Sequence, residues 1–338
     1  MARKIRFGII GCGVISPLHA EAINACPYTE LVAVSDLRLE SARKFAEAFH
    51  VSTYVSDYKE LLAMEEIDVV SICTPSGTHG QIAIDAALAN KHILCEKPLE
   101  IKVDRMTQMI QTSREQGVKL GCVYQRRATG IVKRVKEAIS NDEIGKLILC
   151  DAYLKYHRDQ AYYDSAGWRG TWEMDGGGAL MNQGVHGIDL FLWLTGGVSK
   201  VFARAAALSR KIEVEDTAVS VLECKNGAFG VIEGTTSVFP ERNTRIELYG
   251  EKGTIIFDDN GIQEWITMDK GDITKTIEID QEKIEGARSI GHYYFIEDMA
   301  KAIIEDRDPM VSGEEARKAV DLILAIYESS TKQKEVYL

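Results

Sequence analysis

The sequence predicts an α/β protein with two domains. The first is a doubly wound parallel sheet over residues 1–124, and the second is an α+β domain with a largely antiparallel sheet over residues 125–338. Short apolar runs alternate with helical patterns over the first 120 residues, as in a parallel sheet covered by helices. After about residue 125 the pattern changes to successive strands joined by hairpin turns. The length of 338 residues is enough for two hydrophobic cores.

The first domain is expected to alternate strands with helices. Continuous apolar runs are typical of strands buried on both faces, and they predict strands over 5–11, 31–36, 67–74, 91–98 and 118–125. Between these runs, helical periodicity predicts helices over 16–26, 39–50, 78–90 and 104–117.

The second domain is expected to open with a helix over 131–140, a strand over 146–157 and an irregular stretch rich in Tyr, Trp and Gly. An apolar helix over 176–194 follows. Further strands are predicted over 200–208, 217–239, 244–259 and 264–268, with hairpin turns at 226–228 and 250–253. Helices over 292–306 and 314–330 close the chain.

The composition limits the class of protein. The chain is 45% hydrophobic and 27% charged, as in ordinary globular proteins, and its net charge of −11 argues against a dedicated nucleic-acid binder. Seven dispersed cysteines, several inside apolar runs, predict reduced thiols and a cytoplasmic location without a secretory leader. No cysteine pair has metal-ligand spacing, so no metal is expected. No apolar run reaches the ~20 residues of a membrane span.

A glycine loop follows the first predicted strand and opens the first helix. Gly11-x-Gly13-x-x-Ser16 has the spacing of a dinucleotide-binding fingerprint, with serine at the third position. Val14 and Ile15, between Gly13 and Ser16, are expected to line the cofactor site. The loop predicts a Rossmann domain with the cofactor's pyrophosphate at the helix start.

Asp36 ends the second predicted strand, 20 residues after Ser16. A carboxylate there accepts hydrogen bonds from ribose hydroxyls and repels a 2′-phosphate, so NAD is predicted in preference to NADP. Arg38 has two interpretations. As a contact to a 2′-phosphate it would favour NADP, and otherwise it is a solvated side chain at the helix start.

Two further strand ends carry polar residues, and ligands of open parallel sheets bind at the carboxyl ends of strands. Thr74, Pro75 and His79 follow one strand, and Glu96 and Lys97 follow the next. All five are predicted cofactor contacts. Lys97 leaves an apolar strand directly into the predicted crevice, where desolvation or a nearby nicotinamide cation would lower the pKa of a lysine.

The helix over 176–194 opens on three glycines and carries Asn182, His186 and Asp189. At about 100° per residue these side chains share one narrow stripe. A polar stripe on a mostly buried helix either lines a site or forms a satisfied internal network. One histidine without a further His or Cys cluster is poor ligation for zinc, so a metal is not predicted here.

On these residues the chain resembles the Gfo/Idh/MocA oxidoreductases. The resemblance rests on GIIGCGVISPLH, on the triplet Glu96-Lys97-Pro98, on GGGALMNQGVHGID and on the strands from Asp216 onward. It implies a Rossmann domain, a C-terminal domain whose open sheet supports a homodimer or homotetramer, and NAD as cofactor. It also implies reversible oxidation of a hydroxyl on a sugar, cyclitol or nucleotide sugar.

Lys97 matches the family's catalytic lysine and His186 its catalytic histidine, whereas Asn182 stands where the family often has an aspartate. We expect His186 to take the hydroxyl proton, Lys97 to stabilise the alkoxide and Asn182 to orient the hydroxyl. Asp189 either orients His186 or tethers the helix.

The stretch before the glycines should form the wall of the substrate pocket. The predicted substrate contacts add five residues to the three catalytic ones: Gln125, Arg126, Arg158, Trp168 and Arg169. Arginines beside the predicted site, with Arg127 among them, favour an anionic substrate. Residues 162–186 are similar to the UDP-N-acetylglucosaminuronate 3-dehydrogenases of the family. Two alternatives stay open: a glycosidase using transient C3 oxidation by bound NAD, and a non-enzymatic NAD-sensing regulator.

Overall fold

The computed structural model describes residues 3–279 and 283–338, which form two compact units. The first unit combines residues 1–128 with 282–317, and the second combines residues 129–281 with 318–338. The sequence pattern had placed everything after residue 124 in the second domain. Residues 282–317 instead pack in the first unit, where helix α9 (Ile290–Ile304) lies against α1 (Ser16–Ala25).

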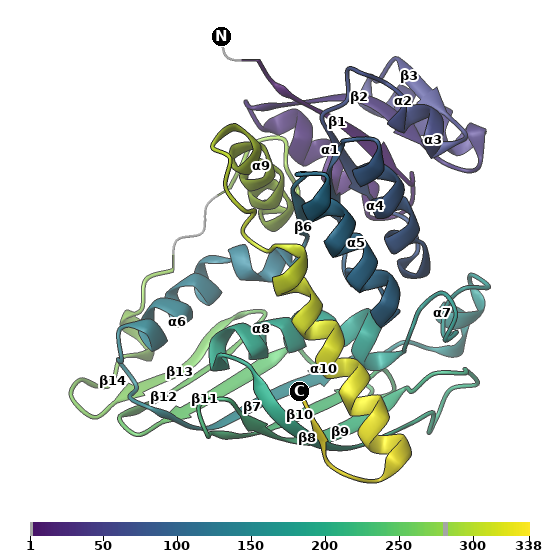
Figure 1. Ribbon diagram of the computed structural model, residues 1–338. Helices are drawn as coiled ribbons and strands as arrows, with labels where there is room; N and C mark the ends of the chain where they lie inside the picture. The colour runs from purple at the N-terminus through teal and green to yellow at the C-terminus, as the bar shows by residue number, and fades with distance from the viewer. Residues whose placement is uncertain (1–2, 280–282) are drawn as a thin grey trace. The chain divides into compact units, whose positions relative to one another are not determined.

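The first unit contains the predicted parallel sheet, covered by helices (Figure 1). Its order is β3-β2-β1-β4-β5-β6, the order of a dinucleotide-binding sheet. The strands are β1 (Ile5–Ile10), β2 (Thr29–Ser35), β3 (Thr53–Val55), β4 (Val69–Ile72), β5 (His92–Cys95) and β6 (Leu120–Cys122). The helices between them are α1, α2 (Leu39–Phe49), α3 (Tyr58–Leu62), α4 (His79–Leu88) and α5 (Val103–Glu115). The sequence pattern missed β3 and α3, which have three and five residues and are too short for a clear period.

The second unit is a nine-stranded sheet in the order β14-β13-β12-β11-β7-β10-β9-β8-β15. Its strands are β7 (Leu147–Lys155), β8 (Val198–Ala206), β9 (Thr217–Cys224), β10 (Phe229–Thr235), β11 (Arg245–Gly250), β12 (Gly253–Asp258), β13 (Gly261–Thr267), β14 (Gly271–Asp272) and β15 (Val336–Tyr337). The sheet is mostly antiparallel, as predicted, and both hairpins are confirmed. One pair departs from the prediction, because β7 runs parallel to β10 and makes the sheet mixed.

Helices of the second unit are α6 (Gly130–Ser140), α7 (Gln160–Asp164), α8 (Val185–Thr195) and most of α10 (Gly313–Lys332), which begins in the first unit. Helix α8 packs on β7 and β11. The opposite face of the sheet carries exposed apolar side chains, among them Phe202, Val219, Val221 and Phe229. Ala218, Ser220 and Leu222 alternate with them and are buried. This alternation is typical of a sheet with only one face covered by its own chain.

No helix among the described residues is long and apolar enough to cross a membrane. No disulfide joins any of the seven cysteines, all of which lie in the described residues. Six of the seven are buried, in agreement with the apolar runs that contain them.

Candidate active site

The glycine loop lies between β1 and α1, where the sequence predicts it. Gly11 has a φ of +94°, and a Cβ at this position would lie 2.8 Å from the carbonyl oxygen of Cys73, so the backbone requires glycine. Gly13 differs, since a Cβ there meets nothing within 4 Å. The Ser16 hydroxyl donates to the Gly13 carbonyl at 2.8 Å and fixes the loop at the helix start. Space beside Gly13, together with the helix start, fits a pyrophosphate.

Asp36 directly follows β2, and its carboxylate is held by backbone N–H groups. One oxygen accepts from Cys12 at 3.0 Å and the other from Arg38 at 2.9 Å. The Arg38 side chain is 81% exposed, with its Nε 3.8 Å from the carboxylate. Val14 and Leu37 are 94% and 90% exposed, so two apolar side chains are exposed in the glycine loop and beside Asp36. The residues present therefore fit the adenosine half of NAD.

The side chain of His79, a predicted cofactor contact, is buried, and both of its ring nitrogens have backbone partners. It is 1% exposed, and each ring nitrogen lies within hydrogen-bond distance of a backbone carbonyl: Nδ1 is 2.8 Å from Pro98 and Nε2 is 2.9 Å from Thr74. The imidazole thus joins the loop after β4, which contains Thr74 and Pro75, to the turn after β5. Its role is to hold these two strand ends together.

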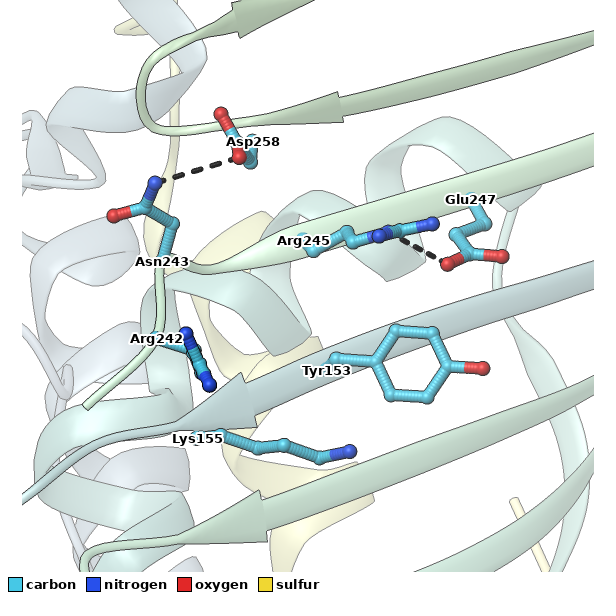
Figure 2. Close-up of a pocket in the computed structure, with 7 residues that line it drawn as sticks. All are labelled: Tyr153, Lys155, Arg242, Asn243, Arg245, Glu247 and Asp258. Carbon is cyan, nitrogen blue, oxygen red and sulfur yellow. Dashed lines mark hydrogen bonds and ion pairs between the residues drawn. The ribbon is translucent and has the colours of Figure 1, made fainter. Parts of the chain in front are cut away.

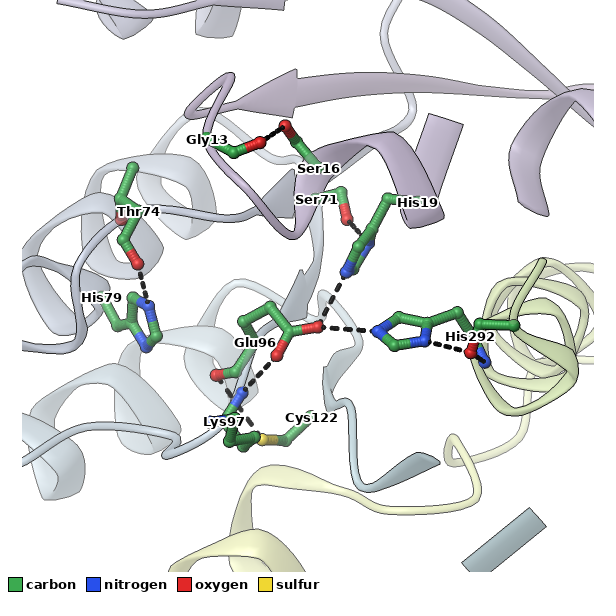
Figure 3. Close-up of polar contacts among 11 residues, drawn as sticks. Gly13, Ser16, His19, Ser71, Thr74, His79, Glu96, Lys97, Cys122 and His292 are labelled. Carbon is green, nitrogen blue, oxygen red and sulfur yellow. Dashed lines mark hydrogen bonds and ion pairs between the residues drawn. The ribbon is translucent and has the colours of Figure 1, made fainter. Parts of the chain in front are cut away.

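The carboxylate of Glu96, another predicted cofactor contact, is buried between His19 and His292 (Figure 3). Lys97 follows it and is half-buried, and its backbone N–H donates to Glu96 Oε2 at 3.2 Å. The sequence had not indicated either histidine. Both positions are separated widely from Glu96 along the chain, by 77 and 196 residues.

The segment after β6 contains Gln125, Arg126 and Arg127 in a 3-10 turn over Gln125–Ala128. Gln125 and Arg126 are half-buried. Arg127 is buried and pairs with Glu315 at 3.2 Å. It is therefore a structural arginine and is removed from the group that suggested an anionic substrate.

In the second unit, two of the three glycines lie against Glu215, a buried acidic residue, and its partner Tyr327. Glu215 accepts the backbone N–H groups of Gly178 at 2.9 Å and Leu180 at 2.8 Å, and the Tyr327 hydroxyl at 2.9 Å. A Cβ at Gly178 would lie 1.9 Å from the Glu215 carbonyl, and one at Gly177 would lie 2.2 Å from the Tyr327 hydroxyl. Only glycine permits this close approach. Burial raises the pKa of Glu215 to about 7, although three donors act against it.

The predicted α-helical stripe is wrong at its first residue. Residues Ala179–Gly184 form a π-helical turn, and the α-helix begins only at Val185. Asn182 lies in the π turn while His186 and Asp189 lie in α8, so the spacing of 100° per residue does not relate Asn182 to the other two. π turns are frequent at functional sites. His186 is 9% exposed, Asp189 is 1% exposed and Asn182 is half-buried.

Asn182 is oriented by a residue that the sequence reasoning missed. Its Nδ2 donates to Asp175 Oδ1 at 2.5 Å, and the other Asp175 oxygen accepts from the Gly170 N–H at 2.9 Å. Its Oδ1 accepts from Gln183 Nε2 at 2.9 Å. With both ends of the amide assigned in this way, the Asn182 side chain has a fixed orientation.

Arginine and aromatic residues of the segment before the glycines lie against one another. The Arg169 guanidinium stacks over Tyr162 at 4.2 Å and over Trp168 at 4.7 Å, and Arg158 lies 5.6 Å from the same tyrosine ring. Arg158 also bonds Gln183 at 3.0 Å and pairs with Glu241 at 3.0 Å. The Nε of Arg169 is buried and has no acceptor within the described ranges.

A pocket of about 600 Å³ lies elsewhere on the second unit, on β7, β11, β12 and the segment before β11 (Figure 2). Arg245 pairs with Glu247 at 2.7 Å within it, and Asn243 bonds Asp258 at 3.4 Å. The residues that line it are Tyr153, Lys155, Arg242, Asn243, Arg245, Glu247 and Asp258. None of them is a predicted site residue.

Family models match both parts of the chain. The oxidoreductase family with an NAD-binding Rossmann fold matches residues 5–124, and the GFO/IDH/MocA C-terminal domain matches residues 132–256. The chain belongs to the Gfo/Idh/MocA oxidoreductases. As a member it is an oxidoreductase with an NAD-binding domain, in a family whose named relatives include dehydrogenases of sugars and inositols.

Individual relatives agree with this assignment. A myo-inositol 2-dehydrogenase of Thermotoga maritima is 30% identical over 99% of this chain and 98% of its own. The WlbA dehydrogenase of Bordetella pertussis, solved with NADH and UDP-GlcNAcA, is 33% identical with a TM-score of 0.88, over 99% of both chains. Its counterpart from Chromobacterium violaceum, solved with the same two ligands, is 30% identical with a TM-score of 0.89, over 100% of this chain and 97% of that one.

Proposed function

We propose that the protein reversibly oxidises a secondary hydroxyl of an anionic nucleotide sugar, at C3 of a UDP-sugar uronate. The observation that carries this proposal is the Arg169 cluster, whose buried Nε has no acceptor among the residues described. A planar guanidinium supported by Tyr162 and Trp168 suits a carboxylate or diphosphate. The likeness to two dehydrogenases solved with UDP-GlcNAcA supports the same class of substrate.

In the proposed reaction the substrate hydroxyl loses its proton while its carbon loses a hydride. When bound, NAD⁺ accepts the hydride. His186 takes the hydroxyl proton, because an imidazole titrates near neutral pH in its unperturbed state. The Lys97 ammonium stabilises the negative charge that develops on oxygen. Asn182, oriented by Asp175 and Gln183, donates a hydrogen bond that directs the hydroxyl.

Asp175 places a carboxylate next to Asn182, the position at which the family often has an aspartate. The carboxylate that the family often has at that position is absent, yet Asp175 brings a buried carboxylate within 2.5 Å of the amide. Asp175 is 2% exposed and accepts two hydrogen bonds, so we assign it to orienting Asn182 rather than to taking a proton from substrate.

We further propose that the open face of the nine-stranded sheet binds a second copy of the chain, giving a homodimer or homotetramer. Phe202 and Val221 are cross-strand neighbours on β8 and β9, 43% and 57% exposed, and Phe229 on β10 is 61% exposed. Contiguous apolar side chains on one sheet face are typical of protein interfaces.

A substrate panel tests the proposed activity. The purified protein is incubated with NAD⁺ and, separately, UDP-N-acetylglucosaminuronate, UDP-N-acetylglucosamine, glucuronate and myo-inositol, and NADH formation is followed by absorbance. We expect the highest kcat/KM with the UDP-uronate. Preference for myo-inositol would favour the activity of the Thermotoga relative instead. Sugar release without net NADH would indicate a glycosidase, and the absence of turnover with NAD⁺ still bound would indicate a regulator.

A further inference from the structure

Three buried side chains meet in the first unit, away from the glycine loop itself. His19 comes from α1, Glu96 from the end of β5 and His292 from α9, and they are 1%, 4% and 2% exposed. Glu96 Oε1 lies 2.8 Å from His19 Nε2 and 3.3 Å from His292 Nε2. Figure 3 shows the carboxylate between the two rings.

The Nδ1 atom of each of the two histidines lies beside a serine hydroxyl. Ser289 Oγ accepts the backbone N–H of His292 as the cap of α9 and lies 2.6 Å from His292 Nδ1. Ser71 Oγ lies 2.6 Å from His19 Nδ1. The Glu96 carboxylate only accepts, so each Nε2 carries the hydrogen that it donates to Oε1, and in a neutral ring Nδ1 then accepts from its serine.

Glu96 is the negatively charged member of the cluster. Burial lowers the pKa of the His19 imidazole, which favours its neutral form. Burial acts to raise the pKa of Glu96, but the hydrogen bonds from both imidazoles outweigh it and hold that pKa well below its usual value. The second oxygen, Oε2, accepts the Lys97 backbone N–H at 3.2 Å. Every polar atom of the cluster thus has a partner without a metal ion.

We propose that Glu96, held by His19 and His292, is a positioning residue that fixes the backbone of Lys97, and that the cluster is held by protons rather than by a metal. The proposal rests on the proposed role of Lys97. One carboxylate joins three segments that are distant in sequence: the helix that follows the glycine loop, the lysine turn and α9. Side chains whose own partners are fixed position a catalytic group more accurately than a free loop.

Paired substitutions at His292 test the role of the Nε2 hydrogen bond. In His292→Gln the amide nitrogen of glutamine reaches the former Nε2 position and can still donate to Glu96. In His292→Asn the shorter amide replaces only Nδ1, and the bond to Glu96 is lost. We expect His292→Asn and Glu96→Gln to lower kcat by about tenfold or more, because small displacements of a catalytic group are costly. We expect His292→Gln to stay within about threefold of wild type.

Two readouts separate positioning from general damage. The Kd for NADH, from fluorescence titration, should change by less than about threefold in both His292 variants, whereas kcat should fall in His292→Asn and not in His292→Gln. His92→Gln is the control, since His92 is a half-buried histidine at the opposite end of β5 whose Nδ1 accepts the Lys119 N–H at 2.9 Å. It should leave kcat unchanged even where it lowers the melting temperature.

Direct observation of the protons completes the test. Long-range nitrogen NMR on histidine-labelled protein should show the Nε2–H tautomer for the resonance that disappears in His292→Gln. An Nδ1–H tautomer there, or one equivalent of metal retained by the purified protein, would overturn the assignment. If Lys97→Ala is inactive but His292→Asn and Glu96→Gln keep the kcat of wild type, the positioning role is overturned. An active Lys97→Ala variant would instead overturn the proposed function.

Discussion

Asn182 Nδ2 lies 2.5 Å from Asp175 Oδ1, and this contact orients the amide that the proposed reaction uses. The Asp175 carboxylate is buried and also accepts the Gly170 N–H. It is therefore held in place by the irregular segment that contains Arg169. The same segment therefore presents the guanidinium and orients the amide. In the proposed reaction, substrate recognition and hydroxyl orientation are linked through this segment.

Replacing Lys97 should separate catalysis from cofactor binding. Lys97→Ala is expected to lower kcat by about 10²–10⁴-fold, the usual effect of losing a group that acts on a transferred proton or developing alkoxide. The Kd for NADH should stay within a few-fold of wild type. Stopped-flow rates and fluorescence titration measure the two quantities. Lys102→Ala, an exposed lysine five residues later, is the control and should behave as wild type.

Asp36 should determine the preference for NAD. Its carboxylate is held at the glycine loop by the Cys12 N–H. Asp36→Ser removes the charge that repels a 2′-phosphate, so the ratio of kcat/KM for NAD⁺ over NADP⁺ should fall by about tenfold or more. Steady-state kinetics with both cofactors give this ratio, and Glu60→Ser on the exposed face of α3 is the control. An unchanged ratio would refute the ribose assignment.

Arg169 should contribute to recognition of substrate charge. Arg169→Lys keeps the charge but loses the planar fork and its stacking on Tyr162. KM for the UDP-uronate should rise by about tenfold or more, whereas any turnover of myo-inositol should keep its KM. Arg43→Lys, in an exposed ion pair with Glu40, controls for the exchange itself. A rise in KM for both substrates alike would show that Arg169 acts on the fold of the segment instead.

Self-association should depend on the open sheet face. Val221 is 57% exposed beside Phe202, and an aspartate there places a charge in the proposed interface. Light scattering coupled to gel filtration should show Val221→Asp as one chain at concentrations where wild type forms a dimer or tetramer. Leu208→Asp, at a residue that is 73% exposed but lies beyond the end of β8, should assemble as wild type. A monomeric wild-type protein would exclude the interface.

Local sequence patterns predicted the features that depend on neighbouring residues. The glycine loop, Asp36 and the strand ends follow from a strand, a turn and a helix within about 30 residues, so their positions could be read directly. The burial of the His79 ring could not be predicted, because its two carbonyl partners come from different strand ends, which no local pattern shows.

Features that depend on distant segments could not be predicted from periodicity. His19 and His292 meet Glu96 only once α1 and α9 pack together. Likewise, Glu215 accepts the Gly178 and Leu180 N–H groups at the π turn over Ala179–Gly184 from 37 and 35 residues away, and apolar spacing alone does not distinguish π from α. The signal that was present was the run of three glycines, since three successive residues without a Cβ indicate close approach by another backbone or side chain.

The Glu215 carboxylate should make stability depend on pH in an unusual direction. Its pKa is raised by burial to about 7 in the folded chain, against 4.5 as the ordinary value. The folded state therefore binds the proton more tightly than the unfolded state, so this group's contribution to stability is complete below pH 4.5 and is lost as pH rises through 7. The loss amounts to about 3 kcal/mol at most.

Urea unfolding of wild type and Glu215→Gln between pH 5 and 8.5 measures this contribution. Glutamine does not titrate, but it places an amide nitrogen against the Gly178 or Leu180 N–H, so the variant should be the less stable protein at pH 5. That deficit should shrink as pH rises to about 7 and then stay constant, because only wild type releases a proton over this range. Glu173→Gln, at an exposed site in the same segment as Asp175, should show a difference from wild type that does not vary with pH. A deficit for Glu215→Gln that is equally constant would mean that the buried carboxylate does not titrate in this interval.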